Sequence, residues 1–235
     1  MPEAFNETAP MTKPARGAVL GIAAAALFGA STPLAKHLVG EVRPQLLAGL
    51  LYTGAAMVLS AVRLVRTSPK EAHLRPSDAP ALLAVTFFGG VLAPVLLLIG
   101  LERVSGVAGS LLLNLEAVFT MALALIVFGE HLDRRAAGGG ATVVVAATVL
   151  GLGSGSSRAD WIGIGCIALA CLCWAIDNNL TQRLSGRDPF AVVRVKATVA
   201  GAVNLALAIS LGVALPPAAT IVAALVLGGA AYGLS

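Results

Sequence analysis

The residues best suited to chemistry in this chain are acids that lie inside long apolar runs. Glu116 lies within the run 104–128, and Asp177 lies within the run 161–182. An acid at the middle of a bilayer costs about 2.5–3.5 kcal/mol on insertion scales, so it is expected to face the protein interior. We predict that Glu116 binds a proton or a cationic group of a substrate. The alternative is a structural ion pair or a hydrogen-bonded anchor, and the sequence leaves both open.

A stripe of polar residues follows one face of the run 161–182. Its members are spaced i, i+3, i+4 and i+7, and they are Trp174, Asp177, Asn178 and Thr181. We predict that this stripe lines a cavity, with polar contacts between packed helices as the alternative. The full set of residues predicted to form a substrate or proton site is Glu116, Asp177, Asn178, Trp174, Thr181, Asn114, Thr120, Ser31, Thr32, Lys36 and Lys196.

The two lysines of that set have a second interpretation. Lys36 and Lys196 lie near the ends of their apolar runs, where a long side chain can extend to the membrane interface. Lys196 can instead neutralise Asp177 or Glu116.

Other kinds of chemistry have little support in the sequence. The three cysteines all lie in the run 161–182, and no second cluster of Cys and His would complete a zinc site. No Ser/His/Asp or Cys/His grouping suits a nucleophilic enzyme. The glycine-rich stretch 151–156 lacks the βαβ context of a nucleotide-binding loop. We therefore predict no catalytic residue, no metal and no cofactor.

The elements that position these residues are predicted to be membrane-spanning helices. The chain is 57% hydrophobic and 12% charged, whereas soluble domains have roughly 45–50% apolar and about 25% charged residues. A helix needs about 20 apolar residues to cross a bilayer. Runs of this kind lie at 17–38, 44–62, 80–101, 104–128, 137–153, 161–182, 190–213 and 218–235. The predicted class is an all-α integral membrane protein with about eight spans present.

The basic residues predict the orientation of the chain. With a cytoplasmic N-terminus, the inner segments hold Lys13, Arg16, Arg63, Arg66, Lys70, Arg75, Arg134, Arg135, Arg183 and Arg187. The outer segments hold only Lys36, Arg43, Arg103 and Arg158. The positive-inside rule favours this orientation. It also explains the net charge of +4 without a nucleic-acid partner.

Two parts of the chain resemble each other. Residues 17–43 align without gaps on 163–189, and Gly89-Gly90 matches Gly228-Gly229. Each unit would hold five spans, and an odd number makes the second unit enter from the opposite face. Such an inverted repeat is typical of secondary transporters. By this repeat we expect ten spans, with the end of the second unit falling beyond Ser235.

Several segments also carry a family resemblance. They are residues 28–36 (FGASTPLAK), 47–52 (LAGLLY), 110–120 (SLLLNLEAVFT), 129–135 (GEHLDRR) and 173–182 (CWAIDNNLTQ). The chain resembles the EamA-type family of the drug/metabolite transporter superfamily over residues 17–235. Many relatives have Pro where this chain has Glu116.

The resemblance implies ten spans in two inverted five-helix halves. We accordingly expect a disordered cytoplasmic tail at 1–16, a first five-span repeat at 17–153, a linker at 154–160 and an incomplete second repeat at 161–235. It also implies transport of small metabolites, often outward and commonly by secondary coupling.

The expected function is therefore a secondary transporter that exports small metabolites or drug-like molecules across the plasma membrane, the inner membrane of a bacterium, with coupling to protons. Its expected partners are a small-molecule substrate and the lipid bilayer, and a homodimer remains open. A passive channel or a non-transporting receptor is the alternative.

Overall fold

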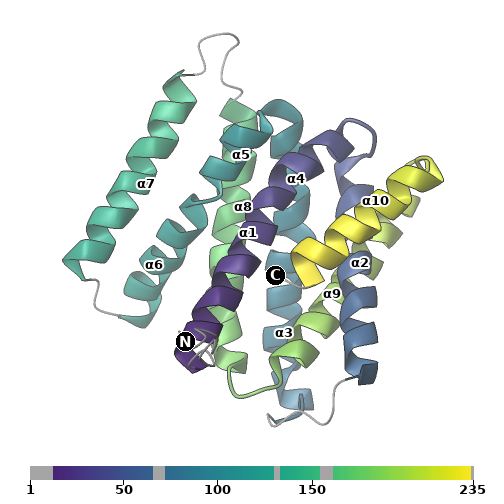
Figure 1. The fold of residues 1–235 in the computed structure, drawn as a ribbon, viewed down its shortest axis with the longest axis horizontal. Helices are drawn as coiled ribbons and strands as arrows, with labels where there is room; N and C mark the ends of the chain where they lie inside the picture. The colour runs from purple at the N-terminus through teal and green to yellow at the C-terminus, as the bar shows by residue number, and fades with distance from the viewer. Residues whose placement is uncertain (1–12, 66–71, 130–132, 154–160, 234–235) are drawn as a thin grey trace, which may run out of the picture.

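The computed structural model describes residues 13–65, 72–129, 133–153 and 161–233, and it is built from helices (Figure 1). The α-helices are α1 (Lys13–Val39), α2 (Pro44–Val65), α3 (Ala79–Val85), α4 (Ala93–Arg103), α5 (Gly106–Leu112), α6 (Leu115–Phe128), α7 (Arg134–Gly153), α8 (Trp161–Thr181), α9 (Pro189–Ser210) and α10 (Ala218–Gly228). Two π-helical segments are η2 (Thr86–Leu92) and η4 (Gly229–Gly233), and the 3₁₀ turns are η1 (Pro76–Asp78) and η3 (Gln182–Leu184).

Six described stretches are long and apolar enough to cross a membrane. They are Gly21–Val39, Pro44–Val65, Pro76–Arg103, Gly106–Val127, Trp161–Leu184 and Pro189–Ser210. Ala218–Gly233 is a shorter apolar helix. The prediction of an all-α membrane protein with several spans is confirmed.

The predicted runs correspond to helices, with three differences. Six of the eight runs qualify as candidate spans among the described residues, whereas α7, at the run 137–153, and Ala218–Gly233, at the run 218–235, do not. α1 is already helical at Lys13, the first described residue of the chain, four residues before the predicted run. The tail predicted for 1–16 therefore overlaps α1, while residues 1–12 and the predicted linker 154–160 lie outside the described residues. The run 104–128 is divided into α5 and α6 by a turn at Leu113-Asn114.

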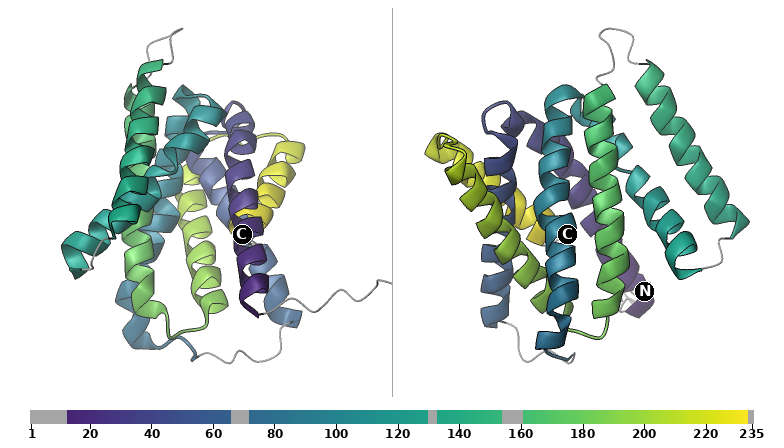
Figure 2. Two further views of the ribbon diagram at one scale, coloured as in Figure 1. Left: turned by 60° about the vertical axis from the view of Figure 1, so that its left-hand side comes forward. Right: turned by 180° about the vertical axis from the view of Figure 1, so that it is seen from behind.

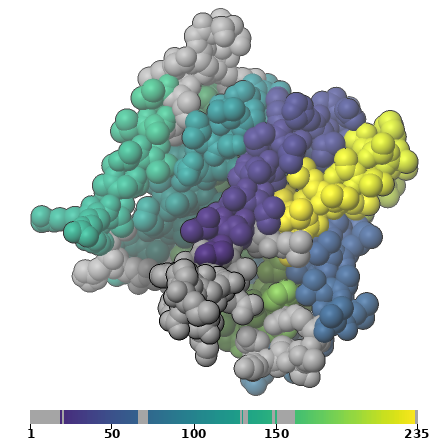
Figure 3. All heavy atoms as spheres, viewed as in Figure 1, coloured from purple at the N-terminus to yellow at the C-terminus, as the bar shows by residue number. Residues whose placement is uncertain are grey.

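The helices pack as a bundle in which segments distant in sequence lie side by side (Figures 1 and 2). α2 packs along α9, and α8 lies between α4 and α6. α1 contacts α10 and η4, and Figure 3 shows the purple α1 beside the yellow C-terminal segment on one face. α7 lies at the edge of the bundle beside α6.

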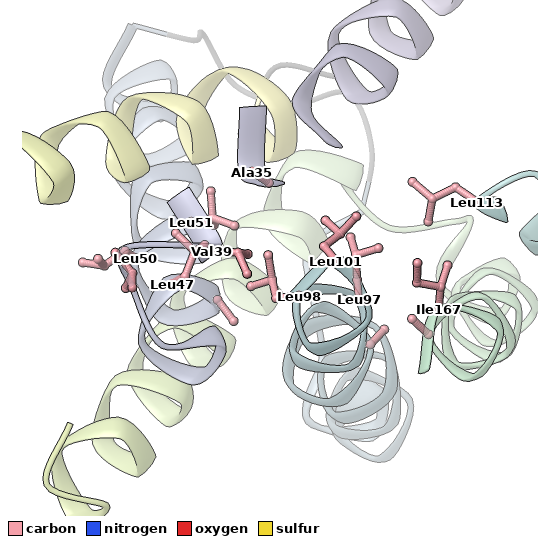
Figure 4. Close-up of a cluster of buried hydrophobic side chains, with 14 of the residues drawn as sticks. Ala35, Val39, Leu47, Leu50, Leu51, Leu97, Leu98, Leu101, Leu113 and Ile167 are labelled. Carbon is pink, nitrogen blue, oxygen red and sulfur yellow. The ribbon is translucent and has the colours of Figure 1, made fainter. Parts of the chain in front are cut away.

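The centre of the bundle is filled by aliphatic side chains from several helices (Figure 4). Leu47 and Leu51 of α2 are fully buried, as are Leu101 of α4 and Ile167 of α8. Lipid is as apolar as these side chains, so close packing rather than exclusion of water must hold the helices together.

Glycines provide that close packing where α2 crosses α10. A Cβ atom at Gly54 would lie 2.0 Å from the carbonyl oxygen of Leu225, and one at Gly228 would lie 2.0 Å from that of Leu51. The crossing is therefore possible only with glycine at both positions.

The π-helical segment η2 leaves two carbonyl groups for side chains to bind. The Ala93 N–H bonds to Phe88 O, a register of i to i−5, and the next residue, Pro94, has no N–H to donate. The Gly89 and Gly90 carbonyls instead accept hydrogen bonds from other helices. The second π-helical segment, η4, begins at Gly229, within the pair that the sequence aligns with Gly89-Gly90.

Candidate substrate site

A cavity of about 470 Å³ opens between the helices, and it is lined from both ends of the sequence. Its walls come from α1, α2, α6, α8, α9 and η4. The residues that line it are Ala24, Ala25, Phe28, Tyr52, Glu116, Trp174, Asn178, Val193, Lys196, Ala197, Ala231 and Tyr232.

A second cavity, of about 560 Å³, adjoins the first. Both are lined by Ala25, Phe28, Glu116 and Asn178, so Glu116 lies at their junction. The other residues around the second cavity are Gly29, Ser110, Leu113, Asn114, Ala117, Thr120 and Met121.

Glu116 is positioned by the turn that divides α5 from α6. Asn114 donates its side-chain amide to Leu111 O over 2.9 Å, and α6 begins directly afterwards, so Glu116 lies in its first turn. The positive end of a helix stabilises an anion there. Asn178 Nδ2 donates to Glu116 Oε1 over 2.8 Å, which ties the carboxylate to α8.

Asp177 is buried beside the cavity and forms an ion pair with Lys196 of α9. Thr181 Oγ1 donates to the second carboxylate oxygen over 3.3 Å. A Cβ atom at Gly89 would lie 2.0 Å from Asp177 Oδ2 and 2.7 Å from Lys196 Nζ, so the pair lies directly against the η2 backbone.

Aromatic rings form another part of the lining. Phe28 meets Trp174 and Tyr232 edge to face, with ring centroids 6.1 and 5.8 Å apart, and Tyr52 lies 5.4 Å from Tyr232. Tyr52 Oη and Trp174 Nε1 both donate to Gly89 O, over 2.6 and 3.0 Å. These two side chains are therefore held in place by the carbonyl that η2 exposes.

The structure brings some of the predicted site residues together and separates others. Glu116, Trp174, Asn178, Lys196, Asn114 and Thr120 line the two cavities. Asp177 lies behind Lys196, and Thr181 reaches the site only through Asp177.

The remaining predicted residues are not among the cavity linings. Ser31 and Thr32 are buried; Ser31 Oγ donates to Phe28 O over 2.6 Å, and Thr32 faces Gly109 of α5. Lys36 donates to the Leu101 and Glu102 carbonyls at the end of α4, which suits a cation at a helix C-terminus.

Tyr52 and Tyr232 belong to the site and were absent from the predicted set. They are the two tyrosines of the chain, and both lie in apolar runs. A buried tyrosine needs a partner for its hydroxyl, and this requirement was the available signal.

Comparison with known proteins places the chain in a family. Residues 15–152 match the model of the EamA-like transporter family, and the chain belongs to that family. An uncharacterized transporter from Methanothermobacter thermautotrophicus is 28% identical over 209 residues, which are 82% of this chain and 61% of the relative. The chain thus spans about three fifths of that relative's length.

A solved crystal structure shares the fold. It aligns with a TM-score of 0.67 over 92% of this chain and 76% of its own, at 19% sequence identity. The family prediction made from the sequence is confirmed.

Proposed function

We propose that the protein is a secondary transporter that exports a small metabolite or drug-like molecule and binds it in the joined cavities at Glu116. The observation that carries this proposal is the position of the cavities. The first cavity lies where α1, α2 and α6 meet α8, α9 and η4, at the boundary between the two predicted repeats, and the second lies between α1, α5, α6 and α8. Transporters built from inverted repeats bind substrate at this boundary.

Proton coupling is the second part of the proposal. Glu116 is a carboxyl group that faces a cavity inside the apolar part of the bundle, and intramembrane acids of this kind commonly relay protons. Family membership and the relative described as a transporter also favour transport over catalysis.

The test uses inverted membrane vesicles that contain the full-length protein. A pH gradient is imposed, and its collapse is followed while pools of amino acids, sugars, nucleosides and organic cations are added. Collapse with one pool, lost in Glu116→Gln and retained in Glu102→Gln, is the expected result. Glu102 is a suitable control because it is an exposed acid at the end of α4.

Two other outcomes contradict the proposal. Flux that never saturates and ignores the gradient indicates a passive channel. Binding of a ligand without flux, in vesicles shown to hold folded protein, indicates a receptor.

A further inference from the structure

From the charges and hydrogen-bond acceptors of the two cavities we infer that the substrate is a primary amine with an apolar body. Its ammonium group binds between Glu116 and Thr120, and its apolar body lies against Phe28, Trp174 and Tyr232. This inference rests on the proposed function and names the substrate class of the same site.

The first argument is the charge of the site. Three charged side chains lie at the cavities, and Lys196 is paired with Asp177. Among the described residues, the Glu116 carboxylate accepts one side-chain hydrogen bond, on Oε1, and its donor is the neutral amide of Asn178. One negative charge is therefore left without a balancing cation, which favours a cationic ligand over a neutral or anionic one.

The second argument is the unused hydrogen-bonding capacity of the second cavity. The Thr120 hydroxyl is buried and has no hydrogen-bond partner among the described residues. It follows Glu116 by four residues on α6, so the two side chains are neighbours on one helical face. The Asn114 amide uses its nitrogen on Leu111 O, which leaves its side-chain oxygen as an acceptor.

These acceptors suit a primary ammonium group. Such a group carries three N–H donors and no acceptor, so it can bond to Glu116 and Thr120 together. A quaternary ammonium would satisfy the charge but would leave the Thr120 hydroxyl without a partner, which carries a penalty in a buried site.

The third argument is the apolar end. Phe28 lines both cavities, as Glu116 does, and its ring contacts the Trp174 and Tyr232 rings. Aromatic rings bind apolar groups and attract a nearby cation through their faces.

The test measures binding of radiolabelled 2-phenylethylamine to purified full-length protein by equilibrium dialysis in detergent. Unlabelled competitors of the same shape are its N,N,N-trimethyl analogue, 2-phenylethanol and 3-phenylpropanoate. We expect the primary amine to bind at least about tenfold more tightly than the alcohol or the acid. The alcohol leaves the buried charge of Glu116 unpaired, and the acid adds a second negative charge beside it.

Three variants locate the groups responsible. Glu116→Gln should weaken both amines about tenfold, whereas Thr120→Val should weaken the primary amine several-fold and should not weaken the trimethyl analogue, which makes no bond to the hydroxyl. Phe28→Leu should weaken both amines and also the alcohol, because all three present the same phenyl group to this ring, and it should weaken the amines more because they also lose the contact of a cation with the ring. Glu102→Gln and Thr198→Val are the matched controls, since both residues are exposed and lie outside the cavities.

The inference is overturned if the alcohol or the acid competes as well as the amine, or if Glu116→Gln binds amine normally. The failure of one proposal can be told from the failure of the other. If a carboxylate or a sugar is transported through the same cavities, the inference of an amine substrate is wrong and the proposed transport function stands. If the amine binds in a manner that depends on Glu116 but no pool is transported, the transport function is wrong and the amine-binding site stands.

Discussion

The ion pair between Asp177 and Lys196 decides which acid of the site has a charge available to a ligand. The sequence marks Asp177 as an intramembrane acid, and in the structure its carboxylate is bonded by Lys196 and Thr181. Its side chain is 5% exposed and that of Lys196 is 17% exposed. The charge available to a ligand therefore resides on Glu116, whose partner is an uncharged amide.

Breaking this pair at one end should destabilise the protein strongly. Asp177→Asn or Lys196→Met alone leaves an unpaired buried charge, and we expect a loss of about 3–5 kcal/mol in the free energy of unfolding. The double variant should lose less than either single one, because no charge is then left unpaired. The free energies of unfolding of the natural protein, the two single variants and the double variant are measured in mixed detergent micelles, as a double-mutant cycle. Additive losses would show that the two groups do not interact.

The same residue scale separates what the sequence predicts from what it does not. Spacing on a helix placed Trp174 and Asn178 on one face with Asp177, and all three lie at the site. The alignment of 17–43 with 163–189 predicts Ser31 and Thr32 on the equivalent face of α1, but Thr32 lies against Gly109 of α5. Periodicity defines a face, while the neighbour of that face depends on the packing of the whole bundle.

At the scale of elements, the π-helical segment η2 provides a backbone carbonyl that holds two side chains of the site in place. A proline inside a helix indicates a kink from the sequence alone, but no sequence signal predicts that the turn before Pro94 is π-helical. The consequence is a carbonyl at Gly89 that accepts bonds from both Tyr52 and Trp174.

Replacing Pro94 by alanine should reduce the contribution of the Tyr52 hydroxyl to the free energy of unfolding. Tyr52→Phe should cost about 1 kcal/mol of stability in the natural background. In a Pro94→Ala background the new N–H can donate to the Gly89 carbonyl, so the cost should fall. Ser210→Ala, which removes a bond to Leu207 O at the end of α9, should cost the same in both backgrounds. An unchanged cost for Tyr52→Phe would contradict this account.

The crossing of α2 and α10 gives a second prediction for the elements. Gly54→Ala should lower the free energy of unfolding by about 1–3 kcal/mol, because its Cβ would overlap the Leu225 carbonyl. Gly165→Ala is the control, since a Cβ there meets nothing within 4 Å and alanine favours the helix. Equal effects of the two substitutions on the detergent-unfolding midpoint would refute the close crossing.

At the scale of the molecule, helices from the two predicted repeats pack on one another. α8 packs on α4, while its predicted counterpart α1 packs on α10 and η4, the counterparts of the helix around η2. α2 and its counterpart α9 pack on each other. The division into repeats nevertheless remains a prediction, and we expect its two units to move relative to each other during transport.

The structure also groups the loops by membrane face. Arg187 between α8 and α9 bonds to Asp78 before α3, through Nη2–Oδ1 and Nε–Oδ2 contacts of 3.0 and 2.8 Å. Asp188 N donates to Ala72 O over 3.0 Å. These two loops therefore lie at the same face, and the α1–α2 loop lies at the other end of the bundle.

This grouping turns the predicted orientation into a labelling experiment. Gly186 and Gly40 are exposed, and a Cβ at either position meets no close neighbour, so cysteine at each leaves the charges of the loops unchanged. In a background without Cys166, Cys171 and Cys173, Gly40→Cys should react with a membrane-impermeant maleimide added to intact cells. Gly186→Cys should react only after the inner membrane is opened, since the positive-inside rule places its arginine-rich loop in the cytoplasm. The reverse pattern would contradict the predicted orientation and place the N-terminal end of α1 outside the cytoplasm.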